Sequence, residues 1–278
     1  MPALGESLIA TTFGPKDGGG ASVFFPAGTA GSGTPLFLAP GLGLDGRVFE
    51  PLSPLHRERR CVFWNLPNEL PASGGTAALA ALYLAHADLS GMPKRFVFGG
   101  ASLGGTIAVA AALAAPERCA GLVLSAGSAS WRELGWFLRL GPFIHPFIPE
   151  RGYHRRFARI LFGKAGKHPV LDSLRGQALH RTKSHVSRVI SLLHEGGPFD
   201  LRPRLAEIGA PALLLHAPDD KVVPIRASQT LSRMPNSQLV EVPGGGHLPF
   251  LSEPEVCVTA ARAFLARIDH AHDAGGAQ

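Results

Sequence analysis

The stretch Arg95-Phe-Val-Phe-Gly-Gly-Ala-Ser-Leu-Gly-Gly-Thr-Ile-Ala108 contains a short β-branched and aromatic run that stops at glycines and continues as an alanine-rich segment. Its centre, Gly100-Ala-Ser-Leu-Gly104, fits the pattern G-x-S-x-G, in which a sharp turn between a strand and a helix exposes a serine hydroxyl at the end of a sheet. Glycine occupies the positions two before and two after the serine, where strand and helix pass too closely for a side chain. We therefore predict a strand ending at Phe98, a helix over about 103–115, and a nucleophilic Ser102 between them. The simpler alternative is a glycine-rich turn with an incidental serine.

Length and composition limit the class of protein. With 278 residues, of which 45% are hydrophobic, the chain is long enough for one large α/β domain and too apolar to be disordered. The first seven residues lack the basic flank and apolar run of a signal peptide, and no stretch reaches the roughly 18 apolar residues of a membrane span. We therefore expect a cytoplasmic protein without a transmembrane segment.

Charge and cysteine content exclude further classes. The net charge is +6, but no basic run is interleaved with aromatic residues, so we expect no nucleic acid to bind. Cys61, Cys119 and Cys257 are too far apart, and odd in number, for a disulfide framework or a zinc site. We interpret them as buried small hydrophobic residues.

Strand-like and helix-like segments alternate over most of the chain, which is typical of a parallel sheet with right-handed crossovers. Residues 8–13 and 22–25 precede this alternation and favour an antiparallel edge. Besides the strand before Ser102, the expected buried strands are 35–39, 60–65, 121–125, 211–216 and 238–242. The expected helices are 47–56, 76–88, 103–115, 225–234, and a last one that starts at a capping box, Ser252-Glu-Pro-Glu255, and runs to about Ile268.

The alternation stops between residues 129 and 209. We therefore divide the chain into a first core part (1–128), an inserted helical cap (129–209) and a second core part (210–278). The apolar stretch 131–149 either lines an acyl pocket or packs on the core. We interpret as the core of the cap two sets of apolar residues at helical spacing, namely Tyr153, Phe157, Ile160 and Leu161, and Val186, Val189, Ile190 and Leu193.

Three residues that follow expected strands supply the side-chain groups for acyl transfer through serine. That chemistry needs a hydroxyl, a neutral imidazole that takes its proton, a carboxylate that orients the imidazole, and N–H donors for the oxyanion. Ser102, Asp220 and His247 occur in the order serine, acid, histidine. Asp219 is a direct competitor for the place of the acid, and we interpret His216 as a structural residue.

In this order and in two local motifs, the chain resembles the α/β-hydrolases over essentially its whole length. The motifs are Asp220-Lys-Val-Val-Pro224, which reproduces the family's Asp-x-x-Val-Pro pattern, and Gly246-His247 in the turn after the last strand. The resemblance implies the α/β-hydrolase fold, a mostly parallel sheet of the eight-stranded type flanked by helices, with an inserted helical cap. One departure is Asn65-Leu-Pro-Asn68, where relatives often have Asp-x-Pro-Gly.

Two backbone N–H groups are expected to bind the oxyanion. The first belongs to Leu103, directly after the nucleophile. By resemblance, the second comes from the loop after strand 35–39, where the family usually has His-Gly-x and this chain has Pro40-Gly41-Leu42. The resemblance thus implies Leu42 as the second donor, with a proline in place of the histidine.

A serine at this turn, rather than an aspartate, argues against halide displacement and epoxide opening. It favours a serine hydrolase that cleaves a carboxylic ester, a thioester or a lactone, with no metal and no organic cofactor. Carbon–carbon bond hydrolysis and cofactor-free perhydrolysis use the same three residues and stay open. A ligand receptor that keeps the pocket and turns over poorly is the alternative outside enzymology.

Most of the positive charge falls in the cap. Between residues 129 and 208 there are fourteen Lys and Arg and six Asp and Glu, so the rest of the chain is slightly negative. Because a cap overhangs the site, this charge would favour anionic substrates, such as an ester on an acidic acyl carrier protein or on CoA, with Arg155, Arg156 and Arg159 as binding residues. Some α/β-hydrolase esterases dock an acidic carrier on a basic cap, and this chain is similar in that respect. A solvated basic face is the alternative.

Overall fold

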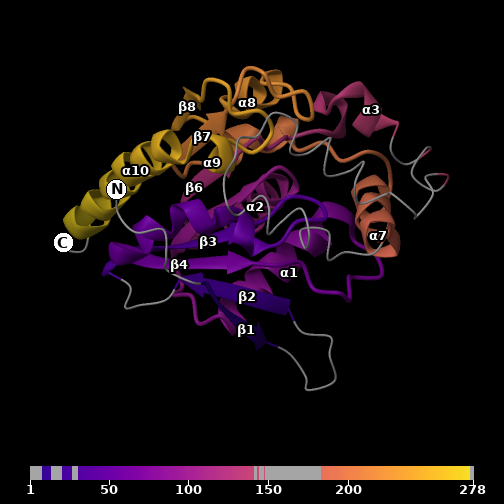
Figure 1. Ribbon diagram of the computed structural model, residues 1–278. Helices are drawn as coiled ribbons and strands as arrows, with labels where there is room; N and C mark the ends of the chain where they lie inside the picture. Colours follow the sequence, from indigo (N-terminus) through magenta and orange to yellow (C-terminus); the bar gives the residue numbers. More distant parts are fainter. Residues whose placement is uncertain are drawn as a thin grey trace.

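The computed structural model describes residues 8–13, 21–26, 31–140, 143, 147 and 183–275. Its strands are β1 (Leu8–Phe13), β2 (Ala21–Pro26), β3 (Gly33–Ala39), β4 (Arg59–Trp64), β5 (Phe96–Ala101), β6 (Cys119–Ser125), β7 (Ala212–His216) and β8 (Ser237–Glu241). They form one sheet in the order β1-β2-β4-β3-β5-β6-β7-β8 (Figure 1). Strands β3 to β8 pair in parallel, whereas β2 pairs antiparallel with both β1 and β4.

Helices cover both faces of this sheet (Figure 1). The α-helices of the described residues are α1 (Gly75–Leu89), α2 (Leu103–Ala114), α3 (Trp136–Arg139), α7 (Lys183–His194), α8 (Arg226–Leu231), α9 (Pro249–Ser252) and α10 (Pro254–Gly275). The 3-10 helices are η1 (Gly46–Arg57), η2 (Pro116–Arg118), η3 (Trp131–Glu133) and η5 (Arg202–Glu207). Helices α1 and α2 pack on one face, and η1, α9 and α10 pack on the other.

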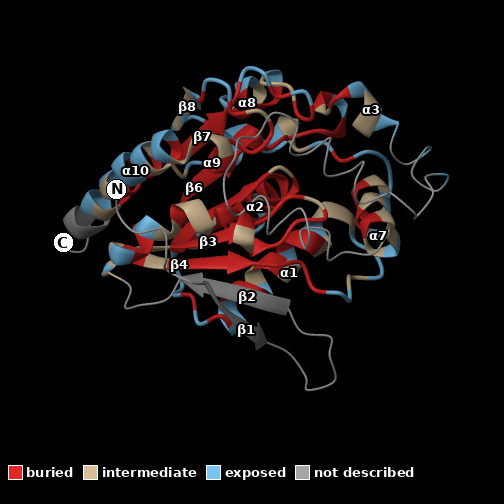
Figure 2. Cartoon of the chain, viewed as in Figure 1, coloured by how far each residue is buried: buried red, intermediate tan, exposed pale blue. Residues whose placement is uncertain are grey.

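The parallel strands are apolar on both sides because each side faces a layer of helices. In β3, Phe37 points into the cluster formed with α1 and α2, whereas Leu36 and Leu38 point into the cluster formed with η1 and α10. All three side chains are fully buried, and the central strands are red in Figure 2. Burial of this kind contributes about 25 cal/mol per Å² of apolar surface and provides the rigid frame on which the strand ends are placed.

The expected order of elements is confirmed, including the antiparallel edge of β1 and β2. The expected capping box at Ser252 is wrong. Ser252 is the last residue of α9, and its hydroxyl donates to the carbonyls of Gly245 at 2.7 Å and of Leu248 at 3.2 Å. The last helix also continues beyond Ile268, to Gly275.

The structure describes only part of the predicted insertion, so the helical cap and its boundaries at residues 129 and 209 stay predictions. Helix α7 packs on α1, and Val189, Leu192 and Leu193 belong to the same hydrophobic cluster as α1 and α2. The apolar stripe of α7 therefore packs on the main domain rather than in a separate cap core. The other stripe, Tyr153, Phe157, Ile160 and Leu161, lies outside the described residues.

The apolar stretch that begins at Trp131 divides into two parts. Trp131 is buried in the cluster shared with α1 and α2, so the beginning of the stretch packs on the core. Trp136 in α3 is 69% exposed. No helix in the described parts of the chain combines the length and the hydrophobicity needed to cross a bilayer. The cytoplasmic location stays a prediction.

Candidate active site

Ser102 lies at the sharp turn between β5 and α2. Its backbone has φ 53° and ψ −118°, a region that non-glycine residues rarely adopt and that costs on the order of 1–3 kcal/mol. A Cβ on Gly100 would lie 2.4 Å from the carbonyl carbon of Gly104, and one on Gly104 would lie 1.9 Å from the carbonyl oxygen of Ala39. The two glycines are therefore required by the close passage of strand and helix, as the sequence pattern predicts.

Asp220 and His247 meet at the same edge of the sheet, after β7 and β8. The Oδ2 atom of Asp220 is 2.9 Å from Nδ1 of His247, and the two residues are 5% and 4% exposed. The other oxygen, Oδ1, accepts the N–H groups of Val222 at 2.8 Å and of Val223 at 3.0 Å. The loop that follows β7 and carries Asp220 is called the acid loop here. Its backbone N–H groups hold one carboxylate oxygen, and the other oxygen faces the imidazole of His247.

Asp219 has a different position. Its Oδ1 accepts the N–H of Gly246 at 3.0 Å, in the loop that carries the histidine. Gly246 has φ 56°, a left-handed conformation that glycine adopts readily. Of the two candidates for the acid, the structure therefore brings Asp220 to the His247 ring and uses Asp219 to support the histidine loop.

The charge state of Asp220 follows from these contacts. Burial by itself raises the pKa of this carboxyl group, but the nearby His247 and the hydrogen-bonding contacts of His216 and His247 offset it. The net effect holds the pKa of Asp220 well below its usual range. A carboxylate that stays ionised fixes a proton on His247 Nδ1 and leaves Nε2 to accept one.

The Nε2 atom of His247 is buried and finds no hydrogen-bond partner among the described residues. Burying a polar atom without a hydrogen-bond partner costs about 1–3 kcal/mol, so the position of this nitrogen needs an explanation. A role as proton acceptor from a hydroxyl provides one. No hydrogen bond joins Ser102 Oγ to this nitrogen in the described structure, and catalytic contacts of this type often tighten only in the reacting complex.

The loop after β3 lies directly against Ser102. A Cβ on Gly41 would be 3.3 Å from Cβ of Ser102, and the carbonyl of Gly41 accepts the N–H of Leu44 at 3.1 Å in a tight turn. Leu42 is in this turn, and Leu103 is the first residue of α2, where the first backbone N–H groups of a helix are not used inside it. Their assignment as an oxyanion hole stays a prediction, now with the loop in place beside Ser102.

Asn65, the first residue of the segment that departs from the family pattern, makes a buried hydrogen bond in the structure. Its Oδ1 accepts the N–H of Gly46 at 2.5 Å, which ties the end of β4 to the start of η1. Gly46 itself is packed so closely that a Cβ would lie 2.8 Å from the carbonyl oxygen of Phe63. The amide oxygen of Asn65 therefore has a structural role in this chain.

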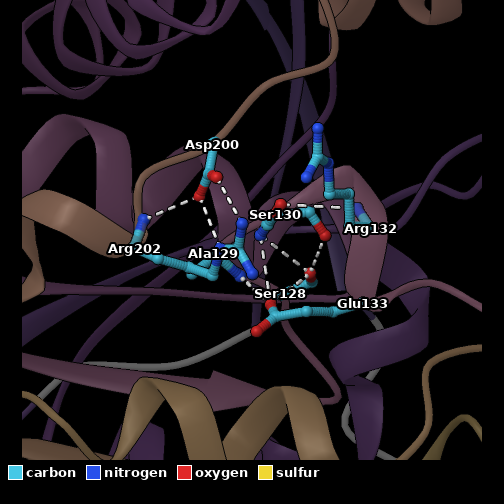
Figure 3. Close-up of polar contacts among 7 residues, drawn as sticks. All are labelled: Ser128, Ala129, Ser130, Arg132, Glu133, Asp200 and Arg202. Carbon is cyan, nitrogen blue, oxygen red and sulfur yellow. Dashed lines mark hydrogen bonds and ion pairs between the residues drawn. The ribbon is translucent and has the colours of Figure 1, made fainter.

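A buried glutamate organises the beginning of the insertion, and the sequence analysis did not single it out. Glu133 Oε2 accepts the N–H groups of Ala129 and Ser130 and the hydroxyl of Ser128, each at 3.1 Å (Figure 3). Ser130 in turn accepts the N–H of Arg132, which completes a capping box for η3. The signal Ser130-Trp-Arg-Glu133 was present in the sequence.

The two ends of the described insertion are fastened together at this point. Ser130 and Asp200 form an isolated antiparallel bridge, and Asp200 pairs with Arg202 beside it (Figure 3). The N–H of Gly135 then donates to the carbonyl of Val222 at 2.9 Å. The base of the insertion is therefore bonded directly to the loop that carries Asp220.

Other predicted features give no further site in the described residues. Arg155, Arg156 and Arg159 lie outside them, so their role as binding residues stays a prediction. No group of three or more potential metal ligands occurs in the described ranges. The three cysteines are buried as expected, and burial raises the pKa of each thiol to about 12, which keeps them unreactive.

The sequence profile of the Alpha/beta hydrolase family matches residues 36–260 of this chain. The chain belongs to that family, which confirms the fold class and the prediction of a hydrolase.

Similar proteins agree with this assignment. The pimeloyl-[acyl-carrier protein] methyl ester esterase of Edwardsiella ictaluri is 28% identical over 240 residues, which are 82% of this chain and 92% of that protein. The enzyme of the same name from Serratia marcescens is 29% identical over 239 residues, 83% of this chain and 93% of that protein. Among solved structures, the esterase RhEst1 from Rhodococcus sp. ECU1013 superposes with a TM-score of 0.75 at 24% identity, covering 94% of this chain and 99% of that one. The prediction of an esterase is thus confirmed at the level of the enzyme class.

Proposed function

We propose that this enzyme hydrolyses carboxylic esters through an acyl-enzyme on Ser102, with His247 as base and Asp220 as the acid that orients it. The observation that carries the proposal is the Asp220–His247 pair at 2.9 Å, whose second ring nitrogen is buried and unpaired among the described residues. It lies at the same edge of the sheet as the strained turn of Ser102, where parallel α/β folds bind their ligands.

The reaction divides into two halves. In the first, Ser102 Oγ attacks the ester carbonyl while His247 Nε2 takes the hydroxyl proton, and the N–H groups of Leu103 and Leu42 stabilise the oxyanion. His247 then gives its proton to the leaving alcohol, and the acyl group stays on Ser102. In the second half, His247 removes a proton from water, which attacks the acyl-enzyme. His247 then returns this proton to Ser102 Oγ as the bond to the acyl group breaks and the carboxylic acid is released. Asp220 stays ionised throughout and stabilises the imidazolium.

The substrate we propose is an ester carried on an acidic partner, such as an acyl-carrier-protein methyl ester. Two facts support it. Relatives that match more than four-fifths of this chain are named pimeloyl-[acyl-carrier protein] methyl ester esterases. The segment between residues 129 and 208 carries a surplus of eight positive charges, which would attract an acidic carrier.

Labelling and kinetics test the two parts of this proposal separately. A fluorophosphonate probe should label wild-type protein but not Ser102→Ala, since labelling needs an activated serine. A receptor that does not turn over would leave the wild type unlabelled. Esterase activity is then measured on a methyl ester attached to an acyl carrier protein and on a short neutral ester of the same acyl group.

Charge reversal of Arg155, Arg156 and Arg159 to Glu should raise KM for the carrier-bound ester at low salt and leave the neutral ester nearly unchanged. Added salt should weaken the wild type in the same way, because exposed charges are screened beyond about 8 to 10 Å at physiological ionic strength. The matched control reverses three exposed cations at the opposite edge of the sheet, Arg57, Lys94 and Arg267. Equal effects of both triple variants, or none, would exclude a carrier site on the cap.

A further inference from the structure

His216 is the last residue of β7 and is fully buried, four residues before the proposed acid. Its Nε2 atom is 2.7 Å from the carbonyl oxygen of Val223 and 3.3 Å from Oδ2 of Asp220. Its Nδ1 atom is 2.7 Å from the hydroxyl of Ser228 in α8. Both ring nitrogens therefore have partners, whereas in His247 only Nδ1 has one among the described residues.

These partners determine which way the hydrogen bonds run. A backbone carbonyl only accepts, so Nε2 of His216 must carry a hydrogen and donate it. The carboxylate of Asp220 also accepts, and lies within reach of the same N–H as a second, longer contact. Ser228 can either donate to Nδ1 or accept from it, because its hydroxyl rotates. The orientation of the ring is thus fixed in either protonation state.

The contacts of His216 link the two loops of the proposed site. The carbonyl of Val223 accepts from the His216 ring, and the N–H of the same residue donates to Oδ1 of Asp220 at 3.0 Å. The backbone carbonyl of His216 accepts the N–H of Val242 at 2.8 Å, where the histidine loop leaves β8. One residue therefore binds the acid loop through its side chain and the start of the His247 loop through its backbone.

We propose that His216 is a positioning residue of this enzyme, whose Nε2–H fixes the acid loop so that Oδ2 of Asp220 faces Nδ1 of His247. This inference rests on the proposed function, since it assigns His216 a role through the two residues that we place in the catalytic machinery. It departs from the interpretation of His216 as a purely structural residue. A purely structural residue would contribute packing alone, and an apolar side chain of similar size could replace it.

Two substitutions distinguish a role of His216 as hydrogen-bond donor from a role in packing alone. His216→Met keeps an unbranched side chain of comparable length without a donor, whereas His216→Gln keeps an N–H group near the position of Nε2. On a short neutral ester we expect His216→Met to lower kcat by about 10- to 100-fold with KM little changed, because a displaced catalytic group of this kind costs about that much. His216→Gln should recover most of the lost kcat.

The control is Leu213→Val, which shortens a buried side chain of the same strand without touching the polar contacts. It should lower the melting temperature while leaving kcat near the wild-type value. If Leu213→Val and His216→Met lose kcat in proportion to their loss of melting temperature, the effect of His216 is structural and the inference is wrong. Equal loss of kcat in the Met and Gln variants would also overturn it.

A spectroscopic readout makes the test independent of turnover. The proton on His247 Nδ1, bonded to Asp220 at 2.9 Å, should give a far-downfield proton resonance in the wild type. We expect His216→Met to shift or broaden this signal and His216→Gln to keep it. A wild type that is inactive on esters and unlabelled by fluorophosphonate would refute the proposed function, whereas an unchanged resonance in His216→Met would refute the positioning role alone.

Discussion

Each of the two edges of the sheet holds a hydrogen-bonded carboxylate, that of Asp220 buried and that of Asp269 partly exposed, and the two have different partners. At the C-terminal ends of the strands, Asp220 is bonded to the imidazole of His247. At the N-terminal ends, Asp269 of α10 accepts from Arg59 at the start of β4, with 3.0 Å between Nη2 and Oδ2, and from the N–H of Thr34 at 2.9 Å. A guanidinium keeps its charge at every physiological pH, but an imidazole can take up and release a proton. The partner of the carboxylate therefore distinguishes the structural pair at the N-terminal edge from the proposed catalytic pair.

Backbone strain also differs between the two edges of the sheet. In the described residues, the non-glycine residues with positive φ are Ser102 at 53° and Ala126 at 48°, and both lie at the C-terminal edge. A cavity of about 550 Å³ lies at the N-terminal edge, lined among others by Arg59, Arg95 and Asp269. Its lining contains two cations and two carboxylates, and neither of the two strained residues. Among the described residues, the strained non-glycine backbone and the unpaired nitrogen of His247 thus both occur at the edge of the proposed site.

The largest expected effect is at the nucleophile. Ser102→Ala should lower kcat by as much as about a million-fold, because the remaining members of such a triad act only through the serine. The fold should stay intact, and a melting temperature near that of the wild type would show this. Residual activity above a few per cent in a purified variant would remove Ser102 from the mechanism.

The next effect separates the two adjacent aspartates. Asp220→Asn should lower kcat by about ten-thousand-fold, since an amide in this place favours the wrong tautomer of His247. Asp219→Asn should cost far less, because Asp219 accepts from the N–H of Gly246 and an amide oxygen can do the same. Both variants are measured for kcat on a short neutral ester. The reverse order would move the acid to Asp219.

These residues also show which parts of the candidate site can be predicted from the sequence. Ser102, His247 and the acid loop are carried by local motifs, so their places at strand ends could be predicted. The choice of Asp220 over Asp219 depends on which carboxylate the N–H groups of Val222 and Val223 bind, and spacing alone leaves that open.

The S-x-x-E pattern of a capping box occurs at Ser130 and at Ser252, and the structure treats the two differently. The one at Ser130 forms a capping box, because Glu133 can fold back onto the backbone of the same buried loop. The one at Ser252 does not, because the Ser252 hydroxyl is taken by the carbonyl of Gly245, seven residues earlier. Contacts across loops decide between identical local patterns, and a single sequence does not contain them.

The third prediction concerns the structural edge. Asp269→Asn should leave kcat unchanged and destabilise the protein by about 1–3 kcal/mol, because it leaves the nearly buried guanidinium of Arg59 without its carboxylate. The value falls below that of a fully buried pair, since the Asp269 side chain is 27% exposed. Chemical denaturation at pH 7 measures the loss, and an equal loss of kcat would contradict the separation of the two edges.

The same variant has a defined pH dependence. Burial raises the pKa of Asp269, but hydrogen bonds from Thr34 and Arg59 outweigh it and lower the pKa below the ordinary value. A lowered pKa in the folded state means that the stabilisation is complete above the unfolded value, near 3.9, and is lost as pH falls through the folded pKa. The stability difference between wild type and Asp269→Asn should therefore be constant from pH 7 to 5 and shrink below about pH 4.

The smallest expected effect tests the strain at the catalytic edge. Ser102→Gly should be more stable than Ser102→Ala by about 1 kcal/mol, because glycine adopts φ 53° without the steric cost that a Cβ brings, although it gains more freedom in the unfolded chain. Ala126→Gly should gain similarly, since it relieves φ 48° without touching the nucleophile. Ala101→Gly is the control, because Ala101 is the last residue of β5, without positive φ, and should lose about 0.5–1 kcal/mol. Unfolding free energies in urea measure all four variants. If glycine destabilises positions 102 and 126 as much as position 101, the turn stores no strain, and the contrast between the two edges then rests on the free nitrogen of His247 alone.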